Sequence, residues 1–93
     1  MSTDLTSVWK RRADVRYRRV EGEAVVLRQS AAEVLVLNGI GAAVLDLADG
    51  ARRVSDWVNA LSGEYDVDEE TLTRDLLEFA AELEQAGLLE RVE

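Results

Sequence analysis

The segment EVLVLNGIGAAVLDLADG, residues 33–50, decides the fold of this chain. It predicts a short strand over Glu33–Leu37 that runs directly into a helix. Valine and leucine occupy positions 34 to 37 without interruption, whereas a strand with one face in water alternates apolar and polar side chains. Both faces of this strand therefore need cover, and we expect another element to dock on it.

The helix after this strand has a start signal and a stop signal. Asn38 is a suitable N-cap, because its side-chain oxygen can accept a hydrogen bond from a backbone N–H of the first turn. Gly50 suits the left-handed C′ position that ends a helix. Gly39 and Gly41 each weaken the helix by roughly 1 kcal/mol relative to alanine, which indicates close packing against its first turn. The apolar stripe with helical spacing comprises Ile40, Ala43, Val44, Leu47 and Ala48.

Two further strands precede this segment, from Val15 to about Arg19 and over Ala24–Leu27. Glu21-Gly22-Glu23 supplies the turn between them. Three consecutive strands with short connections predict an antiparallel meander, in which Glu33–Leu37 lies at an edge. Residues 1–13 are predicted to be a flexible tail, and residues 14–93 to be the folded domain.

Two more helices follow the segment. The first runs from about Val54 to Gly63 and places Trp57 in the core. The second is capped by Asp68 and ends at Gly87. On this last helix Leu77 and Ala81 form a small apolar strip beside the core stripe. The predicted fold class is α+β: a three-stranded antiparallel sheet followed by three helices, in a winged-helix-like arrangement.

Composition excludes several classes of function. The 93 residues include no cysteine and no histidine, so thiolate chemistry and the commonest metal ligand and general base are missing. Gly39-Ile40-Gly41 lacks the lysine and third glycine of phosphate-binding fingerprints. No apolar run reaches the ~20 residues of a membrane span, and no signal peptide is apparent. We predict a cytoplasmic protein that is not an enzyme and has no catalytic residue, metal or cofactor.

Charge argues against nucleic acid as a partner. The net charge is −8, and residues 64–93 hold eleven acidic but only two basic residues. On the last helix Arg74 is the only cation, whereas a helix that reads base edges presents several basic or amide side chains. An acidic surface repels phosphates, so we predict no nucleic-acid binding by this helix.

Several short motifs in this order resemble the PqqD family, which comprises the pyrroloquinoline quinone (PQQ) biosynthesis D protein and related recognition elements for RiPP precursor peptides. The resemblance spans about Val15 to Glu90. The motifs that carry it are Leu37-Asn38, Asp49-Gly50, Tyr65, Asp75-Leu76 with Phe79, and Gly87-Leu88-Leu89.

The resemblance implies a non-catalytic peptide chaperone. Such proteins bind the leader segment of a ribosomally made precursor peptide by strand addition and present it to a modifying enzyme, often a radical SAM protein or a leader peptidase. It implies a peptide site between the third strand and the third helix. Ala80 replaces a larger aliphatic residue of the family, which would widen a groove there. The expected peptide-binding residues are Glu33, Val34, Leu35, Val36, Leu37, Arg74, Leu77, Ala80 and Ala81.

Two other functions stay open at this point. A winged-helix regulator would show salt-sensitive DNA affinity. A self-associating scaffold would pair its edge strand with a second copy, so that a homodimer forms with or without the chaperone role. The precursor and the product pathway, whether quinone cofactor, lasso peptide or other, are not encoded in these motifs.

Overall fold

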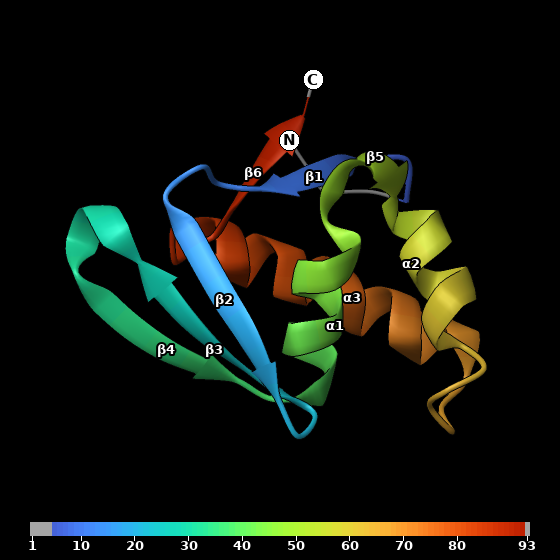
Figure 1. The fold of residues 1–93 in the computed structure, drawn as a ribbon. Coiled ribbons are helices and arrows are strands. Elements are labelled where there is room, and N and C mark those ends of the chain that lie inside the picture. Colours follow the sequence, from blue (N-terminus) through green and yellow to red (C-terminus); the bar gives the residue numbers. More distant parts are fainter. Residues whose placement is uncertain (1–4, 93) are drawn as a thin grey trace.

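A computed structural model describes residues 5–92 and shows an α+β fold (Figure 1). The strands form two three-stranded antiparallel sheets, in the orders β2-β3-β4 and β5-β1-β6. Helix α1 lies between them and contacts β3, β4, β5 and α3. The elements in chain order are β1 (Val8–Arg11), β2 (Val15–Val20), β3 (Glu23–Arg28), the 3-10 turn η1 (Gln29–Ala31), β4 (Glu33–Leu37), α1 (Gly39–Leu47), β5 (Asp49–Arg53), α2 (Val54–Leu61), α3 (Glu69–Gln85) and β6 (Leu89–Val92).

The predicted meander is confirmed as the sheet β2-β3-β4. Val20 pairs with Glu23, so the turn between β2 and β3 has only two residues. Glu21 and Gly22 both have positive φ, at 48° and 87°. This is the type I′ pattern, whose twist matches that of the strands it joins. The turn therefore fixes the register of β2 against β3, and β4 follows in register on the other side of β3.

The tail predicted over residues 1–13 is wrong for the part that the structure describes. Val8–Arg11 is strand β1, which pairs with β5 on one side and β6 on the other. Trp9 is 1% exposed, and its indole N–H donates to Ser7 Oγ over 3.0 Å. A buried tryptophan contributes several kcal/mol, on the order of 3–5 when truncated to alanine. The N-terminal strand is thus part of the core, whereas residues 1–4 lie outside the described range.

The end of α1 also differs from the prediction. Asn38 is the N-cap, but its side chain makes no capping hydrogen bond, and the last helical residue is Leu47. Asp49 Oδ1 accepts from the N–H groups of Ala51 and Arg52, at 2.9 and 3.0 Å, and so turns the chain into β5. Gly50 has the expected positive φ of 84°, but it lies in β5 and not at the C′ position.

Both ends of α3 agree with the sequence. Asp68 Oδ1 accepts from Thr71 N at 2.7 Å, as an N-cap should. At the other end, Gly87 has a φ of 82° and donates to Glu84 O, while Leu88 N donates to Leu83 O. These two bonds form a Schellman motif, in which the glycine takes the left-handed position. The chain then reverses into β6 and buries its apolar side chains.

Candidate functional site

Strand β4 is an edge strand, because within residues 5–92 it pairs only with β3. The hairpin geometry determines which of its backbone groups are free. Glu23 N–H bonds to Val20 across the two-residue turn, and the direction of N–H and C=O then alternates along β3 and β4. Gln29 N donating to Asp14 O, at 3.0 Å, agrees with this alternation. Val34 and Val36 therefore present their backbone N–H and C=O groups to the free edge.

The side chains of β4 divide between two faces. Val34 and Val36 are 64% and 61% exposed and lie on the face away from α1. Leu35 and Leu37 are half-buried and pack against the core. The unbroken apolar run of this strand therefore has one face in the core and one face in solvent. We predicted that both faces of this strand are covered. In the structure the outer face is not covered, because Val34 and Val36 are exposed.

Close packing at the junction of β4 and α1 explains the two early glycines. A Cβ at Gly41 would lie 3.2 Å from Leu37 Cβ, and one at Gly39 would lie 3.3 Å from the Tyr65 hydroxyl. The expected close approach is thus present, to β4 for one glycine and to the segment after α2 for the other. This packing holds the C-terminal end of the edge strand against the first turn of the helix.

The start of β4 is anchored to the end of α3. Arg28 Nη1 lies 2.9 Å from Glu33 Oε1, and these two residues face each other across β3 and β4. The rest of the guanidinium lies against Gly87, where a Cβ would be 2.6 Å from Nη2. Arg28 thereby connects the sheet to the C-terminal end of α3. Sequence gives no signal for this contact, because its partners are about sixty positions apart.

On α3 the structure separates the four expected contact residues. Arg74 and Leu77 line an open cleft of about 680 Å³, and Ala81 is half-buried on the same helix. Ala80 is 0% exposed and belongs to the core, so the expectation that it faces a groove is wrong. A small side chain there permits close packing inside the domain. The cleft is lined by Glu69, Glu70, Thr73, Arg74, Leu77 and Glu78, without a β4 residue among them.

A polar cluster that sequence did not predict connects β2 to α1. Asp46 is exposed on α1, where it accepts from the Tyr17 hydroxyl at 2.5 Å and forms an ion pair with Arg19. The Arg11 guanidinium lies 5.6 Å from the centre of the Tyr17 ring. Burial, and then the bond to Asp46, raise the pKa of Tyr17. The cluster fixes the sheet on the helix that supports the edge strand.

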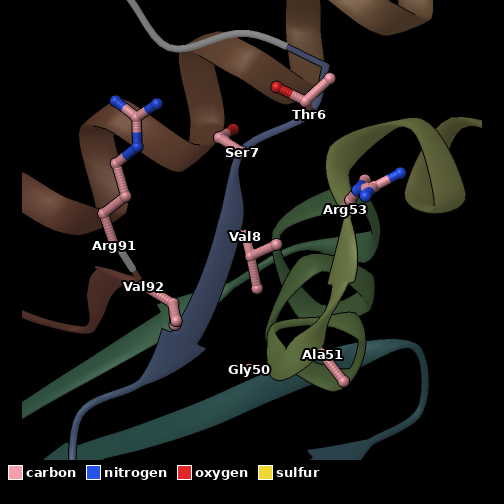
Figure 2. Close-up of a pocket in the computed structure, with 8 residues that line it drawn as sticks. All are labelled: Thr6, Ser7, Val8, Gly50, Ala51, Arg53, Arg91 and Val92. Carbon is pink, nitrogen blue, oxygen red and sulfur yellow. The ribbon is translucent and has the colours of Figure 1, made fainter.

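A second cleft, of about 510 Å³, lies beside the sheet β5-β1-β6 (Figure 2). Val8 lies in the middle, with Arg53 and Arg91 on opposite sides. The two guanidinium groups lie apart and do not point toward each other. Within residues 5–92 no group of three or more acidic side chains is placed to hold a metal ion. No helix in this range combines the length and apolarity needed to cross a bilayer.

Comparison with known proteins places these features in a family. Residues 23–89 match the family model described as coenzyme PQQ synthesis protein D (PqqD). The structure is similar to one of TbiB1 in complex with the TbiA(beta) leader peptide. The identity is 30% and the TM-score 0.79, over 87% of this chain and 94% of the other. A lasso peptide synthetase B1 complexed with the leader peptide has the same fold, with 20% identity and a TM-score of 0.78, over 88% and 96% of the two chains. Curated protein sequences gave no match.

Proposed function

Because this chain belongs to the PqqD family, we propose that it binds the leader segment of a ribosomally synthesised precursor peptide and presents it to a modifying enzyme. The observation that carries the proposal is the free edge of β4, with Val34 and Val36 offering backbone groups that no strand within residues 5–92 uses. Two structures with this fold hold leader peptides, which supports the same occupant here.

Strand addition supplies the affinity in this proposal. Two residues facing the edge offer two N–H and two C=O groups, and each hydrogen bond made to a guest contributes about 0.5–1.5 kcal/mol net. The guest extends the sheet as a fourth strand, and its alternate side chains point to the two faces of that sheet. Strand addition also protects an apolar edge that would otherwise favour aggregation.

Selectivity in this proposal comes from the side chains beside the edge. Leu35 and Leu37 offer half-buried apolar surface on the inner face, and Leu77 with Ala81 extends apolar surface along α3. Arg74 is exposed in the cleft of α3, so we propose that it forms an ion pair with an acidic residue of the leader. Glu33, held by Arg28, marks the end of the edge nearest to Gly87. Ala80 is not part of this surface.

The chain itself contributes no chemical step in this proposal. It concentrates the precursor near an enzyme, and that enzyme, a radical SAM protein or a leader peptidase, carries out the reaction. Binding of this kind raises the local concentration of the substrate without any catalytic group on the recognition domain. The free edge is also able to pair with a second copy, which would compete with the leader for the same groups.

Val36→Pro tests the edge directly. Proline removes the N–H that faces the guest, and it is tolerated on edge strands where that N–H faces outward. We expect a five- to tenfold loss of affinity, corresponding to about 1–1.4 kcal/mol for one hydrogen bond. Fluorescence polarisation of a labelled synthetic leader peptide, chosen by reading the genes that neighbour this one for a small precursor, measures it.

Val36→Ala is the matched control, because it shortens the same side chain and keeps the N–H. It should bind the leader within about twofold of the unmodified chain if backbone pairing dominates. Leu77→Asp tests α3 separately and should also weaken binding. Equal affinity of Val36→Pro and the unmodified chain, with both folded by circular dichroism, would refute strand addition at β4.

A further inference from the structure

The outer face of the sheet β2-β3-β4 is unusually apolar for a surface. Of the large hydrophobic residues within 5–92 that are exposed, all but Leu5 and Val67 lie on this one face. Exposed apolar residues that gather in one place mark interaction sites, whereas scattered ones need no explanation. The residues of this outer sheet face are Val20, Val25, Leu27, Val34 and Val36, with exposures of 38–64%.

The register of the strands gives this face a defined pattern. Val25 lies opposite Val36, and Leu27 lies opposite Val34, so β3 and β4 form an apolar half. On the other side of β3, Arg18 lies opposite Val25 and Arg16 opposite Leu27. The β2 half is therefore cationic. Residues at alternate positions in a strand share a face, so these side chains form one continuous surface.

The two arginines differ in how far they are engaged. Arg16 Nη1 donates to the backbone carbonyls of Ala13 and Val15, at 3.0 and 3.1 Å. Arg18 is exposed and forms no salt bridge with any residue of the described range 5–92. Among the residues of β2, β3 and β4, Glu23 at the hairpin end of β3 is the carboxylate on this face. A complementary surface would carry acidic groups opposite β2.

A second copy of the chain does not satisfy this pattern. Sheets that pack face to face keep their strands roughly aligned, and a symmetric dimer uses the same patch on both subunits. A twofold axis across the strands would place Arg16 and Arg18 against the same arginines of the other copy. An axis along the strands would place them against the valines of β4. Both arrangements bury arginine without an acidic partner, which is costly.

We propose that the outer sheet face docks the protein that acts on the bound leader. Its contact surface would have apolar side chains opposite β3 and β4 and carboxylates opposite Arg16 and Arg18. This inference rests on the proposed function. A leader strand added to β4 extends the same face, since its alternate side chains stand beside Val34 and Val36. The docking protein thus contacts host and guest together and binds the loaded domain more tightly than the empty one.

The test uses the double variant Val25→Ser/Leu27→Ser, which changes the middle strand and leaves the edge of β4 intact. The control, Leu5→Ser/Val67→Ser, removes equally exposed apolar residues from outside this face. Calorimetric titration of the leader-loaded domain with a purified radical SAM protein or leader peptidase, chosen by reading the neighbouring genes, gives the enzyme affinity. We expect about a tenfold or greater loss for the test variant and less than twofold for the control. Leader affinity should stay within about twofold for both.

Reversing the charge of the two arginines provides an independent test. Arg16→Glu/Arg18→Glu should weaken enzyme binding more in low salt than in high salt, because exposed charges are screened. Enzyme affinity unchanged in both double variants would overturn the inference.

Two other results would also overturn it. The first is a dimer of the unmodified chain in sedimentation that becomes a monomer in Val25→Ser/Leu27→Ser. The second is binding of the unmodified chain, without leader, to vesicles of phosphatidylcholine and phosphatidylglycerol, if Val25→Ser/Leu27→Ser no longer binds them. Failure of the unmodified chain to bind the leader would instead refute the proposed function.

Discussion

Substituting alanine for Gly87 should destabilise the domain by two separable effects. A left-handed conformation costs an alanine roughly 1–2 kcal/mol. The added Cβ would also lie 2.6 Å from Nη2, 2.7 Å from Cζ and 3.0 Å from Nε of Arg28, so the guanidinium has to leave. Its departure breaks the ion pair with Glu33, which is partly exposed and contributes up to about 1 kcal/mol. The total loss should be about 1–3 kcal/mol.

Two other glycines of this chain separate these effects. Gly22 has a φ of 87° and open space around its Cβ position, so its alanine variant should lose only the conformational part. Gly63 has neither a positive φ nor a neighbour within 4 Å, and its alanine variant should be neutral or slightly stabilising. We therefore expect Gly63→Ala to be the most stable of the three variants, Gly22→Ala to be less stable, and Gly87→Ala to be the least stable. Urea unfolding followed by the fluorescence of the buried tryptophans measures all three.

A double-mutant cycle with Arg28→Ala tests whether the Cβ added at position 87 clashes with the Arg28 guanidinium. Without the guanidinium, Gly87→Ala should cost only the conformational part, so that the two substitutions couple by about 1 kcal/mol. A loss of the same size with Arg28 present and absent would refute the contact between this side chain and the end of α3. The single Gly87→Ala variant should also bind the leader less tightly, because Glu33 at the start of β4 loses its anchor.

Three further predictions concern other parts of the fold. Removal of residues 1–13 should abolish cooperative unfolding, because it deletes Trp9 and the middle strand of one sheet; a cooperative urea transition in the truncated chain would contradict this. Tyr17→Phe should cost about 1 kcal/mol in urea at pH 7 through loss of the bond to Asp46, and should remove a loss of stability that begins as pH rises past about 10, since the pKa of Tyr17 is raised in the fold. The N–H of Thr71 lowers the pKa of Asp68, so this cap stabilises above about pH 4 and its contribution should disappear as pH falls below that value; a stability profile from pH 6 to 2 that is the same for Asp68→Asn would contradict it.

The parts of the fold that sequence predicted are those decided by near neighbours. The β2–β3 turn, the edge strand and both ends of α3 follow from residues within a few positions of each other, such as Gly22, Asp68 and Gly87. Helix periodicity likewise placed Trp57 in the core, where it is 0% exposed.

The second sheet was not predicted, because its strands pair with partners that are far apart in the sequence. Val8 pairs with Val92 and with Arg53, and Trp9 pairs with Arg91. The basic residues around Trp9 look like a solvated tail until those partners are known. The same limit applies to the candidate site: the strand was predicted, but the contact between Arg28 and Gly87 and the burial of Ala80 depend on how α3 packs.

The pairing of β1 with β6 has a consequence for how this domain is combined with other proteins. Both ends of the described chain leave from neighbouring strands, on a different sheet from the one that carries β4 (Figure 1). A domain with adjacent ends can be spliced into a surface loop of a larger protein without stretching either connection. The free edge of β4 would remain open after such an insertion. The same fold can therefore serve both as a separate subunit and as a domain inserted into an enzyme.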